Sequence, residues 1–193
     1  MVNKTTNRYP ISSLIENRWS TRAFSGSKVE EGKLNSILEA GLWAASAFNE
    51  QPWRFIVGRK GSETYDKILS TLVEWNQRWA GKAGVLVLNI AKNTFTHNNK
   101  PNATCNYDLG QAAAFMSIEA VNQGLCSHQM SGFDAQKAAE IFNINRGYNI
   151  VSVTAIGYYG DAEELPADMQ KSENEERSRK NFNTMVFTGK FEN

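Results

Sequence analysis

The chain has 193 residues, 41% of them hydrophobic, and a formal net charge of +1. Length and apolar content predict a single globular domain over 1–193, and the near-neutral charge argues against a nucleic-acid partner. The first ten residues lack an apolar signal core, and no apolar run approaches the roughly 18 residues of a membrane span. We therefore expect a cytoplasmic protein with no membrane partner.

The chain contains two cysteines, Cys105 and Cys126, which stand in no metal-ligand spacing. A disulfide between them is an open alternative, but free thiols in a reducing compartment fit so low a cysteine count better. We expect no metal site.

Helical and strand patterns alternate along the first half of the chain. Helices are expected over 11–17, 30–45 and 63–79, and strands over 53–59 and 85–91. Leucines and an isoleucine recur at helical spacing in 30–45, so one face of that helix should be buried. The two strand segments are rich in apolar residues, which is typical of buried strands.

The second half opens with a polar stretch, residues 92–106, that has no period. A loop of this length in a compact domain is a lid, a binding loop or a disordered segment. The later elements are expected as a helix over 107–123, a strand within 124–130, a helix over 135–142 and a strand over 149–158. Alanines in the 107–123 helix indicate close packing against another helix. Residues 185–191 alternate like a strand, but they lie far along the chain from the other core segments.

Familiar catalytic motifs are absent from the sequence, including GxGxxG, the Walker glycine-lysine loop, HExxH and GxSxG. The two histidines, His97 and His128, fit surface or core hydrogen bonding better than catalysis. No catalytic side chain is therefore assigned. A chain so poor in acid–base pairs is either not an enzyme or takes its chemistry from a cofactor.

Six segments, taken in order, resemble the nitroreductase family. They are RWSTRAF (18–24), SAFNEQPWRFIV (46–57), DLGQAAAFMSIEAVNQGL (108–125), MSGFD (130–134), AIGYYG (155–160) and ERSRK (176–180). The resemblance implies an α+β fold with a mostly antiparallel central sheet flanked by helices. It also implies an intertwined homodimer with C-terminal strand exchange, and FMN bound at the interface between the subunits.

The resemblance assigns the arginines to the cofactor. Arg18, with Trp19 and Ser20 beside it, matches the family's phosphate clamp, where a planar guanidinium can bind bidentately. Arg22 matches a cation beside the N1–C2 edge of the flavin, which stabilises the reduced anion. Arg177 and Arg179 match a second basic pair on the phosphate. Without the resemblance, both pairs would be interpreted as solvated charges at helix ends.

Two further segments carry family roles at the flavin ring. Met130, Ser131 and Gly132 match a loop whose backbone N–H points at flavin N5, although many members have glutamate where this chain has Ser131. Asn76 matches an asparagine that hydrogen-bonds the pyrimidine edge.

The remaining assignments concern a second subunit. Ala45, Ser46, Ala47 and Asn49 lie in a turn that, in relatives, reaches the flavin held mainly by the other subunit. The 184–193 tail is expected to cross over and add a strand to the partner's sheet, and 92–106 to be a substrate-side loop.

The function implied is reduction of nitroaromatics, quinones or similar small electron acceptors, with NADH or NADPH as donor, by a ping-pong mechanism. Two alternatives stay open at this point. One is a flavin-binding or regulatory protein of the same fold without turnover, and the other is a small interaction domain without flavin.

Overall fold

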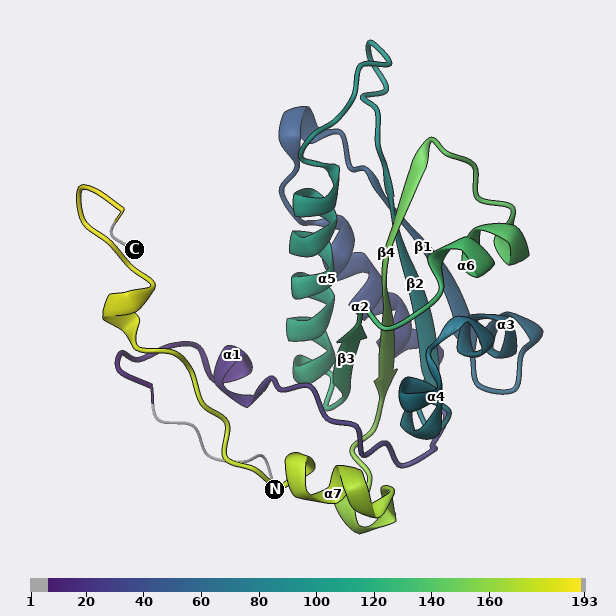
Figure 1. Cartoon of the computed structure of the whole chain (residues 1–193), viewed down its shortest axis with the longest axis vertical. Coiled ribbons are helices and arrows are strands. Elements are labelled where there is room, and N and C mark those ends of the chain that lie inside the picture. The colour runs from purple at the N-terminus through teal and green to yellow at the C-terminus, as the bar shows by residue number, and fades with distance from the viewer. Residues whose placement is uncertain (1–6, 192–193) are drawn as a thin grey trace.

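A four-stranded antiparallel sheet forms the centre of the molecule (Figure 1), in a computed structural model that describes residues 7–191. The strands are β1 (Trp53–Arg59), β2 (Val85–Lys92), β3 (Cys126–Met130) and β4 (Tyr148–Gly157). Their order in the sheet is β1-β2-β4-β3, and each neighbouring pair is antiparallel. The expected α+β fold with an antiparallel sheet is confirmed.

Helices cover both faces of this sheet. The described helices are α1 (Ser13–Asn17), α2 (Glu31–Leu42), α3 (Glu63–Thr71), α4 (Glu74–Ala80), α5 (Cys105–Asn122), α6 (Ala135–Phe142) and α7 (Ala167–Glu173), with single 3-10 turns at Ala47–Asn49, Ala162–Glu164 and Phe182–Thr184. Helices α2 and α5 pack on one face, and α3, α4 and α6 pack on the other. Within residues 7–191, none of the helices combines the length and apolarity needed to cross a membrane.

The central strand β2 shows why this layered arrangement is stable. Its side chains alternate between faces, so Val85 and Val87 enter the core under α2 and α5 while Leu86 and Leu88 enter the opposite core. Helices α2 and α5 approach closely, because a Cβ added at Gly41 would lie 2.8 Å from Met116 Cγ. This contact confirms that α5 packs closely against another helix, and the small residue at this point is Gly41 of α2.

The expectation of one helix over 63–79 is wrong, because α3 and α4 are separate helices. Leu72 and Val73 between them have extended backbones. Their gap is filled by the loop after β3: the Val73 amide donates to Gly132 O at 3.1 Å, and Asp134 N donates to Thr71 O at 2.7 Å. The break is caused by a loop that is distant in sequence. Residues 63–79 contain no glycine or proline that would have predicted it.

Other boundaries moved by a few residues or changed in character. The polar loop is shorter than 92–106, because Lys92 belongs to β2 and α5 begins at Cys105. Strand β1 is an edge strand of the sheet and only partly buried, because one of its sides has no neighbouring strand within residues 7–191.

The C-terminal segment leaves the body of the molecule. In the chain as described, 185–191 form no strand, and Met185 and Phe191 expose 61% and 75% of their surface. The segment before α1 lies near the one that contains Phe182 (Figure 1), and the rings of Tyr9 and Phe182 meet edge to face at 5.3 Å. The last two residues of the expected 184–193 tail lie outside the described part.

Gly160→Ala should lower the free energy of unfolding by about 1–3 kcal/mol, because overpacking forces the backbone to shift. An added Cβ there would lie 2.5 Å from the backbone carbon of Phe24. Gly32→Ala is the control, since its Cβ meets no atom within 4 Å and lies inside α2, where alanine is the better helix former. Urea denaturation checks both variants, and a Gly160→Ala protein as stable as wild type would contradict the packing described.

Candidate functional site

Three arginines from the two ends of the chain gather beside α1. Arg18 ends α1, and its Nη1 donates to Ser20 Oγ at 3.3 Å. The pKa of Arg18 is lowered, first by burial and then by the positive charges of Arg179 and Arg177. Like charges held this close repel one another, so the group favours a bound anion.

The individual arginines are held in different ways. Arg177 donates to the Arg18 carbonyl at 2.9 Å and the Glu16 carbonyl at 2.8 Å, which uses part of its five-donor guanidinium to hold the end of α1. Arg179 is exposed, and its Nη1 donates to Ser178 O. Trp19 is half-buried beside the Tyr159 hydroxyl, and burial raises the pKa of that tyrosine to about 12.

Residues 20–23 lie outside the helices and strands, and their burial alternates. Thr21 and Ala23 are buried, whereas Ser20 is exposed and Arg22 is only partly covered. The buried Glu173 at the end of α7 accepts hydrogen bonds from the Arg22 amide at 3.0 Å and from the Ala23 amide at 3.3 Å. The segment therefore has a fixed inner side, which leaves Ser20 and Arg22 on the outer side.

His128 supports the same segment from the sheet. Its Nδ1 donates to the Thr21 carbonyl at 3.0 Å, and its ring lies 4.5 Å from that of Trp79. Because side chains alternate along β3, His128 and Met130 share one face, on the side of Trp79. Strand β3 thus contacts residues 20–23 through His128 and ends at Met130, where the MSG loop begins.

Asn76 and the MSG loop are brought together by the break between α3 and α4. Asn76 Nδ2 donates to Gly132 O at 3.0 Å. A Cβ at position 132 would lie 2.7 Å from that same nitrogen, so a side chain there would displace the Asn76 amide. Met130 is buried and Ser131 is exposed.

The Ala45–Asn49 turn lies apart from the other predicted site residues. The Ala47 amide donates to Asp108 Oδ2 at 3.2 Å, which places the turn at the first turns of α5. Segment α1 lies toward the other end of that helix (Figure 1), which at 18 residues is roughly 27 Å long. Phe48 and Asn49 have positive φ angles of 55° and 53°, and the Phe48 side chain is 85% exposed. One chain therefore does not join this turn to the arginine group.

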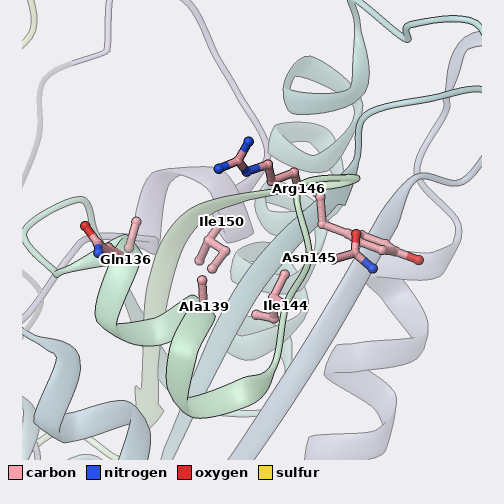
Figure 2. Close-up of a pocket in the computed structure, with 8 residues that line it drawn as sticks. Gln136, Ala139, Ile144, Asn145, Arg146 and Ile150 are labelled. Carbon is pink, nitrogen blue, oxygen red and sulfur yellow. The ribbon is translucent and has the colours of Figure 1, made fainter.

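A separate pocket of about 280 Å³ lies between α6 and the start of β4. Figure 2 shows Ala139, Ile144 and Ile150 gathered at its centre, with Gln136 and Arg146 at its edge. None of the residues predicted to bind a cofactor lines it.

Sequence reasoning missed the residues that hold the site in place. Glu173 sits in the run SENEE, where nothing distinguishes a buried acid from a solvated one. His128 was expected to be a hydrogen-bonding residue, but its acceptor, the Thr21 carbonyl, lies 107 positions away. Only the folded chain identifies either partner.

Comparisons with known proteins agree with the family resemblance and the fold. A family model, the nitroreductase family, matches residues 15–158. A crystal structure of an oxidoreductase containing FMN is 34% identical, covers 100% of this chain and 98% of its own, and has a TM-score of 0.91.

Two relatives known by sequence are also similar. An uncharacterized 15.4 kDa protein in the ask 5′ region of Mycolicibacterium smegmatis is 32% identical, over 72% of this chain and 98% of its own length. The major NAD(P)H-flavin oxidoreductase of Aliivibrio fischeri is 25% identical, over 85% of this chain and 94% of its own length.

His128 should make the protein less stable in acid. Burial lowers the pKa of the folded ring, so as pH falls below about 6.5 the unfolded chain gains a proton that the folded chain resists. Stability then falls until the pH passes the folded-state pKa. His128→Gln removes the titrating ring but leaves the charges of Glu173 and of the nearby arginines in place. This variant should therefore lose less unfolding free energy between pH 7 and pH 5 than wild type.

Denaturation at several pH values checks this prediction. His97→Gln is the matched control, because His97 lies exposed in the loop after β2. An unchanged pH slope in His128→Gln, or an equal change in both variants, would contradict the assignment.

Proposed function

Because the chain belongs to the nitroreductase family, we propose that it is an FMN-dependent oxidoreductase that reduces small electron-poor compounds with NADH or NADPH. Nitroaromatics and quinones are the acceptor classes we expect. The FMN in the similar oxidoreductase and the flavin activity named for the Aliivibrio relative support this choice of cofactor and donor.

The group formed by Arg18, Arg177 and Arg179 is the observation that carries the proposal. Burial and the neighbouring positive charges lower the pKa of Arg18. The repulsion among the three arginines is unfavourable, and a bound anion with more than one negative charge would offset it. The phosphate of FMN fits that requirement, and Ser20 adds a short hydroxyl donor next to Arg18.

The other predicted residues would hold the flavin ring. Arg22 would place its cation at the N1–C2 edge and stabilise the charge that this edge gains on reduction. Asn76 would orient the pyrimidine edge, and the backbone of Met130, Ser131 and Gly132 would lie beside N5. FMN, when bound, supplies two-electron transfer between the nicotinamide and the acceptor in ping-pong order. The protein's part is binding, orientation and charge, so no acid–base side chain is required.

A homodimer would complete the site. Ala45, Ser46, Ala47 and Asn49 lie apart from the arginines in one chain, and a second copy would bring its own turn to the ring. The exposed Phe48 and Met185 add apolar surface for such an interface. We propose that 184–193 is the exchange tail and that the 92–106 segment lies on the substrate side. Both cysteines are free and buried, which supports a reducing compartment such as the cytoplasm.

The alternative is a flavin-binding or regulatory protein without turnover. The two readings differ in one observation: anaerobic NADH or NADPH should bleach the flavin absorbance of an enzyme, and a quinone or nitro compound should restore it. Purified protein that carries flavin but is bleached by neither nucleotide would favour the alternative. Protein without any flavin would overturn both.

Arg18→Ala should weaken FMN binding by about 1.5–3 kcal/mol, the scale of a hydrogen bond to a charged group. Arg146→Ala removes an exposed arginine outside the arginine group and serves as the control. Titration of apo-protein, followed by quenching of flavin fluorescence, gives both dissociation constants. Equal affinities of Arg18→Ala and wild type would remove the phosphate from this group.

A chain that ends at Asn183 should lose the dimer and the FMN together. Obligate interfaces bury on the order of 2,000–5,000 Å², and the tail supplies the exposed apolar residues from Met185 onward. A chain that ends at Phe191 is the control. Light scattering and flavin absorbance measure the two losses, and a shortened protein that stays a flavin-loaded dimer would rule out the exchange.

A further inference from the structure

Glu173 is a buried acid whose carboxylate faces residues 21–23, the segment that includes Arg22. Its residue is only 3% exposed. The carboxylate accepts hydrogen bonds from the Thr21 hydroxyl, from the Arg22 amide at 3.0 and 3.1 Å, and from the Ala23 amide at 3.3 Å. Burying a carboxylate is costly unless such donors compensate it, so this contact is specific and hard to rearrange.

These bonds determine which way the segment faces. The Thr21 hydroxyl and two successive amides donate to Glu173 of α7, and Gly160 N donates to the Ala23 carbonyl at 2.8 Å. The backbone of Arg22 therefore has little freedom to rotate, and its guanidinium starts from a defined point.

The same carboxylate also reaches the charge of Arg22. Arg22 Nη1 lies 4.0 Å from Glu173 Oε2, and the Arg22 side chain remains 28% exposed. At that distance an ion pair is partial: the carboxylate offsets some of the cation's field and holds the guanidinium toward α7. One residue thus fixes the backbone of Arg22 and restrains its head group.

We propose that Glu173 is a positioning residue that sets the reduction potential of the flavin through Arg22. The proposal rests on the proposed function, because it requires FMN beside Arg22. By restraining that cation, Glu173 keeps the reduced anion less stabilised than a free Arg22 would, and so keeps the flavin a stronger reductant.

The test is the two-electron midpoint potential of the bound FMN in the full-length protein. Glu173→Gln keeps the shape and one acceptor oxygen but removes the charge, so the potential should rise. Glu163→Gln, an exposed acid in the turn before α7, should leave it unchanged. In an Arg22→Gln background, Glu173→Gln should produce only a small remainder of its shift, because its effect passes through Arg22.

Each outcome bears on the proposal. An unchanged or lowered potential in Glu173→Gln would overturn it, and so would a shift of equal size in the Arg22→Gln background, which would indicate a direct field effect. Wild-type protein that binds no FMN would instead overturn the proposed function itself.

A second measurement uses the wild-type protein and so does not depend on whether a variant folds. Amide hydrogen exchange in the wild-type protein should show slow exchange at Arg22 and Ala23, because both amides bind the buried carboxylate. Fast exchange at both positions would show that Glu173 does not fix the segment, and would also overturn the proposal.

Discussion

The contact between the Glu173 carboxylate and the backbone of residues 21–23 is the constraint on which the candidate site depends. It joins α7 to the segment that follows α1. Without this contact, the backbone that orients Ser20 and Arg22 would not be fixed. The nearby arginines would then have no defined position relative to them. A buried, fully engaged carboxylate suits this task, because its loss leaves several donors unpaired at once.

The constraint works against a second one, the mutual repulsion of Arg18, Arg177 and Arg179. Like charges gather only where hydrogen bonds hold them, and here Arg177 holds the Arg18 and Glu16 carbonyls. Hydrogen bonds within the fold therefore hold an unfavourable charge group together. That is the expected behaviour of a preorganised binding site, in which the protein bears the cost before the ligand arrives.

The sequence predicted well those features that local pattern controls. Strand 53–59 and helix 135–142 match the structure at both ends, and the α2–α5 contact follows from small residues on one helix face. Features that depend on contacts between distant parts of the chain were not predicted. The break at Leu72 and Val73 exists because the loop after β3 binds there, and no local residue encodes it.

The site shows the same division. Motifs identified the arginines and the MSG loop as candidates, because each lies in a short and chemically distinctive stretch of sequence. They did not reveal Glu173, since an acid within an acidic run looks solvated until its partners are placed. The Ala45–Asn49 turn was predicted to reach the flavin of the other subunit, and within one chain it lies near the first turns of α5, apart from the arginines. We propose that it acts at the flavin of a second subunit.

The most direct test of this account is a crystal structure of the protein grown with FMN. We expect a dimer in which the phosphate lies within hydrogen-bonding distance of the Arg18 guanidinium and Glu173 still binds the amides of Arg22 and Ala23. A phosphate held elsewhere, with Arg18 turned to solvent, would contradict the account.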